Sequence, residues 1–253
     1  MQFLRQYCRR KESVYMQPKV TFSIIKNKNY QEVWDIQTAF HKELIEKKLQ
    51  KRYLPASDQK ILYQDHQLIF CEHHHVYTLG KSGSMDHLLL SDDEIKNENI
   101  EFFKINRGGD ITYHGPGQIT GYLIMDLEEF TTDVHLFVRN IEEAIIRYIS
   151  TWGLEGIRLP KYTGVWLPPD KTSDKYRKIC AIGVHLSRWV SMHGFAFNLN
   201  TDLSYYDKII PCGIIDEDKT VTSLSAETGQ ILDWDTVAKD LSLVFSEVFG
   251  FKF

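Results

Sequence analysis

Three short segments rich in apolar and β-branched residues follow one another in the second half of the chain, and no helical pattern separates them. They lie at Gly164–Leu167, Lys178–Leu186 and His193–Asn200. Parallel strands need a crossover of a dozen or more residues, usually a helix, whereas antiparallel strands join through short turns. The succession therefore predicts a mixed, largely antiparallel sheet and disfavours a doubly wound parallel fold.

Helical periodicity and further apolar runs surround these segments. Three stretches repeat apolar residues on one helical face: Gln31–Arg52, Asp133–Trp152 and Trp234–Phe249. Four more stretches are expected to be strands: Lys19–Ile25, Gln67–Glu72, Phe102–Asn106 and Ile119–Leu127. The expected fold is α/β, of the α+β kind, in which a mixed sheet is flanked by helices in one domain.

Composition agrees with one globular domain. The 253 residues are 43% hydrophobic and 25% charged, which allows a sizeable core. No apolar run approaches the roughly 20 residues that span a bilayer. A net charge of −4 disfavours nucleic-acid binding, which usually needs a basic face. We expect a flexible tail at residues 1–17 and a folded domain at 18–253, with its core at about 62–250.

The cysteines indicate a reducing compartment. Cys8, Cys71, Cys180 and Cys212 stand alone, without a CxxC pair, so reduced thiols and a cytoplasmic location are expected. The basic N-terminus has a mitochondrial transit peptide as its alternative interpretation.

The densest feature of the sequence is the glycine-rich stretch Arg107–Gln118, which reads RGGDITYHGPGQ. Glycine allows close approach of the backbone to a ligand, but it also serves tight turns between strands. The stretch lacks the GxxxxGK[ST] pattern of a nucleotide loop and the GxGxxG pattern of a dinucleotide site. The polar residues among the glycines favour a binding segment over plain turns; they are Arg107, Thr112, Tyr113, His114 and Gln118.

Two further residues could take part in catalysis. Cys212 lies between Pro211 and Gly213, on a bend that would present its thiol, although a lone cysteine is more often a small buried apolar residue. Lys178 begins an apolar strand, where a charge needs a partner or a task, unless it extends to water at the strand end. A lysine beside the cysteine would favour the thiolate.

These pieces together resemble the octanoyltransferase family of lipoate biosynthesis, in the biotin/lipoate protein ligase superfamily. The matching segments, in order, are Glu72-His73 with Val76–Gly80, Arg107–Gln118, Lys178–Gly183, Arg188–Val190, Met192–Asn200, Pro211–Gly213 and Val221–Leu224. The resemblance runs from about Val20 to the C-terminus. It departs from the family at His74 and His75, where the family usually has one or two prolines.

The resemblance implies an acyltransferase with a biotin/lipoate protein ligase catalytic domain. Octanoyl-acyl carrier protein would acylate Cys212, and the thioester would pass to a lysine of a lipoyl domain, such as those of 2-oxoacid dehydrogenase E2 subunits or glycine-cleavage protein H. Lys178 would lower the pKa of Cys212 and relay a proton. No ATP, metal or other cofactor is expected, and neither is a nucleic-acid or membrane partner. A monomer is expected.

The resemblance also implies the residues of an acyl-binding pocket. They are Arg107, Gly108, Gly109, Asp110, Ile111, Thr112, Tyr113, His114, Ala181, Ile182, Gly183, Gly194, Phe195 and Ala196, with His193 and Gln118 as polar support. For docking of the carrier protein, the basic residues Lys161, Lys171, Lys175 and Arg177 are the expected surface, with a solvated loop as the alternative.

Alternative functions stay open at this point. An ATP-dependent lipoate or biotin ligase of the same superfamily would need no cysteine, and lipoate ligases tend to have YHDxGN where this chain has His114-Gly-Pro-Gly-Gln118. A metal-binding protein could use Cys71, Glu72 and His73–His75, but neighbours on a strand point to opposite faces. A non-catalytic carrier-binding member of the fold would not need Cys212 or Lys178.

Overall fold

The computed structural model describes residues 17–26, 28–55, 65–210 and 217–253. Its larger sheet has the strand order β1 (Val20–Lys26), β2 (His66–Glu72), β6 (Gln118–Ile124), β10 (Val190–Asn198), β9 (Tyr176–Ser187), β8 (Tyr162–Leu167) and β7 (Ile157–Leu159). The short strand β11 (Lys219–Val221) pairs with β9. All neighbours from β2 to β7 are antiparallel, whereas β1 with β2 and β11 with β9 are parallel. The mixed, largely antiparallel sheet is confirmed.

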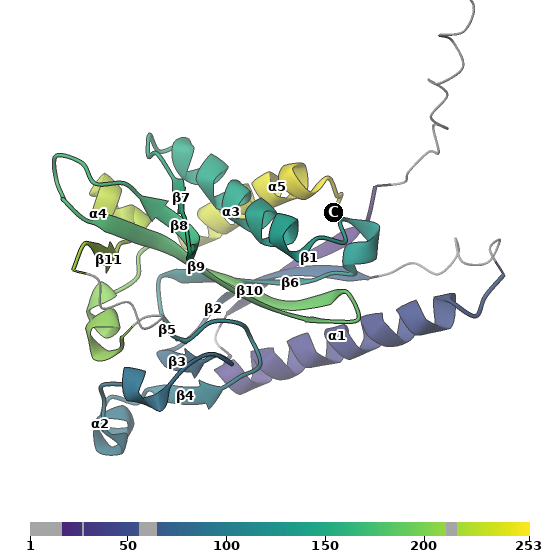
Figure 1. Cartoon of the computed structure of the whole chain (residues 1–253), viewed down its shortest axis with the longest axis horizontal. Coiled ribbons are helices and arrows are strands. Elements are labelled where there is room, and N and C mark those ends of the chain that lie inside the picture. The colour runs from purple at the N-terminus through teal and green to yellow at the C-terminus, as the bar shows by residue number, and fades with distance from the viewer. Residues whose placement is uncertain (1–16, 27, 56–64, 211–216) are drawn as a thin grey trace, which may run out of the picture.

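A smaller sheet lies against one face of this assembly. Its order is β4 (Glu101–Lys104), β3 (Val76–Leu79) and β5 (Ile111–His114). Figure 1 shows it below the larger sheet, near the first turn of helix α1 (Tyr30–Lys51). Tyr30, at the start of that helix, contacts the rings of Phe103 and His114. The glycine-rich stretch therefore contains a strand, β5, and is more than a pair of turns.

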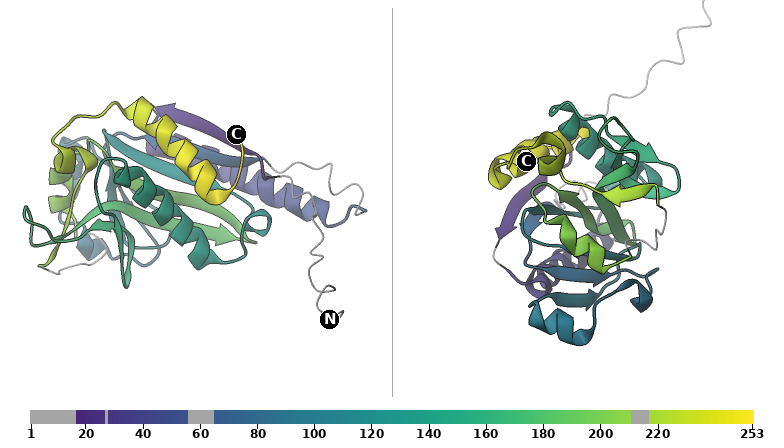
Figure 2. Two further views of the ribbon diagram at one scale, coloured as in Figure 1. Left: turned by 90° about the horizontal axis from the view of Figure 1, so that it is seen from above. Right: turned by 90° about the vertical axis from the view of Figure 1, so that its left-hand side faces the viewer.

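The long helices cover both faces of the larger sheet. Helices α3 (Val134–Ser150) and α5 (Trp234–Phe249) lie together on one face, and α1 lies on the other (Figures 1 and 2). Asn29, Asp133 and Asp233 cap the three helices, each accepting backbone N–H groups of the first turn. The short helices are α2 (Asp92–Asn97) and α4 (Leu224–Thr228).

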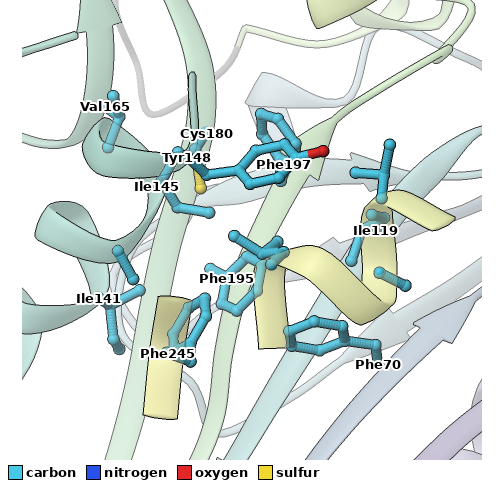
Figure 3. Packing of buried hydrophobic residues seen from close by; sticks show 14 of the residues in the cluster. Phe70, Ile119, Ile141, Ile145, Tyr148, Val165, Cys180, Phe195, Phe197 and Phe245 are labelled. Carbon is cyan, nitrogen blue, oxygen red and sulfur yellow. The ribbon is translucent and has the colours of Figure 1, made fainter. Parts of the chain in front are cut away.

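Strand β2 shows how the sequence builds two cores at once. Leu68 and Phe70 face α3 and α5, while Ile69 and Cys71 face α1. Successive side chains of a strand point to opposite faces, so the uninterrupted apolar run Leu68–Cys71 is buried on both sides. Figure 3 shows the larger core, where Phe70 and Phe195 approach Phe245 of α5.

The three long helices match the sequence expectation to within a few residues. In the described part of the chain, no helix is both long and apolar enough to cross a membrane. The expected flexible tail falls almost entirely in residues 1–16, outside the described residues, and Cys212 also lies outside them.

Candidate active site

A cavity lies between the two sheets and is open to solvent at one side. Its floor comes from β6, β9 and β10 of the larger sheet, and its cover comes from β5 and the loop before it. The lining residues are Tyr30, Arg107, Gly109, Ile111, Thr112, His114, Thr120, Tyr122, Thr163, Lys178, Ala181, Ile182, Gly183, His193, Gly194, Phe195 and Ala196. A concave, mostly apolar site with a few polar side chains is typical of small-molecule binding.

Small residues make the floor. Ala181 of β9 pairs with Ala196 of β10, and Gly183 pairs with Gly194. The alternate position, Phe195, turns its ring into the larger core and stacks on Phe245 with ring centroids 5.0 Å apart. The pleat therefore places bulk on the core side and leaves a groove on the cavity side. A groove of this kind fits an extended alkyl chain.

The RGG turn fixes the cover to the floor. Arg107 donates to the carbonyl of Thr78 at 2.5 Å and to its hydroxyl at 3.0 Å. The Gly108 N–H donates to the Val184 carbonyl of β9 at 3.0 Å. Gly109 has φ +83°, a left-handed conformation that favours glycine. The hydrogen bonds of Arg107 and the left-handed conformation of Gly109 explain the arginine and the second glycine of this turn.

His114 stands at the centre of a buried hydrogen-bond chain. Its Nδ1–H donates to Gln118 Oε1 at 2.9 Å, and its Nε2 accepts from the Thr78 hydroxyl at 3.2 Å. Only the neutral imidazole can donate at one nitrogen and accept at the other. Burial, and then the nearby Arg107 charge, lowers the pKa of His114 to about 4. His114 is therefore a neutral polar wall of the cavity at neutral pH.

His193 is held in an unusual conformation beside it. Its φ is +63°, which is uncommon for a residue other than glycine. Its Nε2–H donates to Asn106 Oδ1 at 2.7 Å. Burial, with Arg107 second, lowers its pKa to about 3, so this imidazole is also neutral at neutral pH. Backbone strain of this kind clusters at functional sites.

Lys178 lies at the junction of two cavities. Its amine is 4.6 Å from the centre of the Trp166 ring, a cation–π distance. The side chain lines the cavity described above and also a second, more polar one formed with Trp166, Tyr206, Asp207, Ile209, Lys219, Thr220 and Val221. Val221 is the register partner of Lys178, and Ile209 is the second-to-last described residue before the segment that carries Cys212. The buried lysine is therefore next to described residues on both sides of the segment that carries Cys212.

The two described cysteines have inert surroundings. Cys71 packs against α1, and Cys180 lies in the core beside Tyr148 (Figure 3). Burial raises the pKa of Cys71 to about 12 and raises that of Cys180 further. Thiols of this kind stay protonated at neutral pH and serve packing.

Residues 29–246 match the model of the lipoyl protein ligase A/B catalytic domain. The chain belongs to this family. The match confirms the resemblance inferred from the sequence motifs.

Close relatives of this family member are octanoyltransferases. That of Christiangramia forsetii is 50% identical over 223 residues, which cover 88% of this chain and 92% of the relative. That of Cytophaga hutchinsonii is 49% identical over 209 residues, covering 83% and 84%.

Solved structures of lipoate ligases share the fold of this family member. A bipartite lipoate protein ligase from Thermoplasma acidophilum has a TM-score of 0.64 at 17% identity, covering 94% of this chain and 86% of that chain. Lipoate-protein ligase A bound with ATP has a TM-score of 0.62, also at 17% identity, covering 94% and 87%. At this identity the likeness concerns the fold alone, because one fold hosts many activities.

Most of the predicted pocket residues of this family member line the cavity, but four do not. Gly108 contacts β9 through its backbone, and Asp110 pairs with His87 and accepts from the Ile111 N–H. Tyr113 turns its hydroxyl to His75 at 2.7 Å, away from the cavity. Gln118 lies behind His114 and orients it, which is the supporting role expected for it.

Four lining residues were missed by the sequence reasoning. Thr120 and Tyr122 lie in an apolar strand that looks like ordinary core. Tyr30 begins a helix far away in sequence, and Thr163 sits at the exposed mouth. The glycine beside Tyr122 was the one available signal, since an isolated glycine in a strand often marks close approach.

The residues from Cys71 to His75 do not converge on one point in the structure, although Cys71 Sγ lies 3.8 Å from His73 Nδ1. Glu72 accepts from the Gly117 N–H at 2.8 Å, His73 bonds the Tyr122 hydroxyl at 2.6 Å, and His75 bonds Tyr113. Among the described residues, no group of three or more histidine, cysteine or acidic side chains is arranged to hold a metal ion. The metal-binding alternative therefore gains no support from the geometry.

One residue of the expected basic docking surface is neutralised. Arg177 pairs with Glu227 at 2.8 Å and with Asp170 at 2.5 Å. Burial opposes its charge, but the two carboxylates together raise the pKa of Arg177. Arg177 therefore ties the loop to α4 instead of offering a free charge to a partner.

Proposed function

We propose that this chain transfers an octanoyl group from octanoyl-acyl carrier protein to a lysine of a lipoyl domain, through a thioester on Cys212. The family membership and the octanoyltransferase relatives support the transferase activity. The observation that carries the proposal is the placement of Lys178, 7% exposed, between an apolar groove and a second cavity.

The first half of the reaction loads the enzyme. The Cys212 thiolate attacks the carbonyl carbon of the octanoyl thioester, and a tetrahedral intermediate forms. The bond to the phosphopantetheine sulfur then breaks, and that sulfur takes a proton from the Lys178 ammonium. A nearby cation lowers the pKa of the attacking thiol and stabilises the negative charge that develops.

The second half of the reaction transfers the octanoyl group from the enzyme to the acceptor lysine. The neutral amine of the acceptor lysine attacks the Cys212 thioester, an amide forms, and the Cys212 thiolate leaves. The acceptor nitrogen loses one proton, which Lys178 takes back. One thioester is exchanged for another and then for an amide, which is downhill, so the cycle needs neither ATP nor a metal ion.

The cavity supports a binding role for its predicted residues. The groove of Ala181, Gly183, Gly194 and Ala196 accommodates the alkyl chain. The neutral imidazoles of His114 and His193 border the groove without adding charge. The second cavity provides the route for the phosphopantetheine arm and then for the acceptor lysine.

The test is incubation of the purified chain with octanoyl-carrier protein in the absence of ATP, followed by intact mass and peptide mapping. We expect one octanoyl adduct on Cys212 and none in Cys212→Ser. Lys178→Met should slow adduct formation by about 10²-fold or more near neutral pH, the usual scale for loss of a proton-transfer group. Lys239→Met, which changes an exposed lysine of α5 that lines neither cavity, is the control and should stay within a few-fold of wild type.

Two results would contradict the proposal. An adduct that persists in Cys212→Ser would remove the cysteine from the mechanism. An absolute requirement for ATP would instead favour a ligase that activates a free acid, the superfamily alternative.

A further inference from the structure

The acyl cavity has a direction that the strand register defines. Strands β9 and β6 both pair antiparallel with β10, so they run the same way along the cavity. Ala181, Ala196 and Thr120 form one row across the three strands, and Gly183, Gly194 and Tyr122 form the next lining row. At about 3.3 Å per residue, these rows lie roughly 10 and 16 Å along β9 from Lys178.

Tyr122 is the large side chain in the far row. It is 3% exposed, and it lines the cavity from the floor, opposite the loop that holds Arg107. Its hydroxyl is 2.6 Å from His73 Nε2, and His73 is itself buried. The hydrogen bond and the burial hold the ring in place, because moving it would leave the imidazole nitrogen unpaired.

The cavity is closed on the opposite side of the same row. A side chain at Gly183 would come within 2.8 Å of the Gly108 carbonyl, so the RGG turn lies directly over this position. At the next residue of β9, the Val184 carbonyl accepts a hydrogen bond from the Gly108 N–H. Among the described residues, the β9 positions that line the cavity end at Gly183, and those of β6 end at Tyr122.

We propose that the ring of Tyr122 is the end wall of the acyl cavity and sets the longest alkyl chain that the enzyme accepts. The inference rests on the proposed function, because it takes the thioester to lie at the Lys178 end. Tyr122 is thus a specificity-determining residue that touches the terminal carbons and takes no part in the chemistry. One methylene in a hydrophobic pocket changes selectivity by about tenfold or more.

The experiment is a competition among hexanoyl-, octanoyl-, decanoyl- and dodecanoyl-carrier protein, with the acyl-enzyme read by intact mass. Wild type should load octanoyl in preference to dodecanoyl. Tyr122→Leu should raise the dodecanoyl-to-octanoyl ratio by about tenfold or more. Tyr122→Phe keeps the ring and should keep the wild-type ratio. Ala196→Val fills the nearer row and should raise the hexanoyl-to-octanoyl ratio by a similar factor.

The outcomes separate the two proposals. If wild type forms no adduct with any donor, the proposed function fails. If wild type loads octanoyl but Tyr122→Leu keeps the wild-type ratio, or Tyr122→Phe shifts it equally, the end-wall proposal alone fails. Should thermal melting show Tyr122→Leu to be unfolded, Ala196→Val carries the test. An unchanged octanoyl preference in Ala196→Val would overturn the assigned direction of the cavity.

Discussion

The buried histidines of the cavity are the residues whose properties depend most on their surroundings. His114 and His193 are buried near the Arg107 guanidinium, and both have lowered pKa values. In each case burial is the largest cause and the Arg107 charge the second. Neutral imidazoles hold the hydrogen bonds to Gln118 and Asn106 without placing a second charge beside the arginine. The two imidazoles therefore make one wall of the site polar without adding positive charge to it.

This arrangement predicts a loss of stability in mild acid. The folded pKa of His114 is about 4, below the usual 6.5, so the unfolded chain binds more protons between these values. The contribution of His114 is complete above pH 6.5 and is lost as the pH falls toward 4. Urea unfolding of wild type should show a decrease of about 2 kcal/mol from this residue between pH 7.5 and pH 5. His114→Gln should flatten that part of the pH dependence.

His135 offers the matched control because it is exposed on the first turn of α3. His135→Gln should leave the pH dependence unchanged. An unaltered slope in His114→Gln would show that this imidazole is not the protonation-sensitive group.

The place of individual residues in the site could be predicted from the sequence only where they belong to a recognisable motif. Arg107, Gly109 and His114 of RGGDITYHGPGQ line the cavity, and their functional roles stay predictions. Asp110 and Tyr113 belong to the same motif but turn away to His87 and His75. Alternation along β5 places Thr112 and His114 on the cavity face and Tyr113 on the other, and the strand itself was hidden among glycines.

At the scale of elements, the contact between β9 and the RGG turn positions the cover over the floor. A methyl group at Gly183 would lie 2.8 Å from the Gly108 carbonyl and 3.2 Å from Arg107 Cδ. A methyl group at Gly108 would meet only the Val184 carbonyl, at 3.4 Å. Two neighbouring glycines thus differ sharply in their tolerance of a side chain.

We therefore expect Gly183→Ala to lower the free energy of unfolding by about 1–3 kcal/mol, as overpacking commonly does, and to slow acylation as the turn lifts. Gly108→Ala should remain close to wild type in both measurements. Thermal melting and the adduct assay check this pair. Equal behaviour of the two variants would mean that the turn is not packed against β9 as described.

The elements themselves were predictable in proportion to their length. Helices α1, α3 and α5 repeat their apolar face over several turns, and this makes the period unmistakable. Strands β3, β5, β7 and β11 have three or four residues each, too few to show alternation, and they were missed. The cavity depends on β5 and on the register of β6 against β10. Its lining therefore could not be predicted from local sequence, because it is set by pairing between strands that are distant in the chain.

At the scale of the whole molecule, a buried ion pair joins α1 to the far end of the larger sheet. Lys48 Nζ lies 2.6 Å from Asp126 Oδ1, with both side chains almost fully buried. The same amine donates to the Arg188 carbonyl at 2.8 Å, in the turn between β9 and β10. One lysine thus connects the helix, the end of β6 and the hairpin.

Lys48→Met should destabilise the fold by about 3–5 kcal/mol, because it leaves the Asp126 carboxylate buried without its partner. Lys47, one residue earlier, pairs with Glu43 and Asp65 at the surface, so Lys47→Met should cost less than about 1 kcal/mol. Denaturant titration compares the two variants, while adduct formation by the folded fraction should be unchanged in both. A surface-like cost for Lys48→Met would refute the role of the pair.

Gln118 connects the active site to α5, the C-terminal helix. Its side-chain amide nitrogen donates to the Tyr113 carbonyl and to Asn198 Oδ1, and its backbone carbonyl accepts from the Trp234 indole N–H at 3.1 Å. Trp234 is the first residue of α5, a helix on the opposite side of the larger sheet from the cavity. A C-terminal truncation that removes Trp234 would therefore remove a hydrogen bond that supports the active site. It would do so although it deletes none of the residues that a substrate touches.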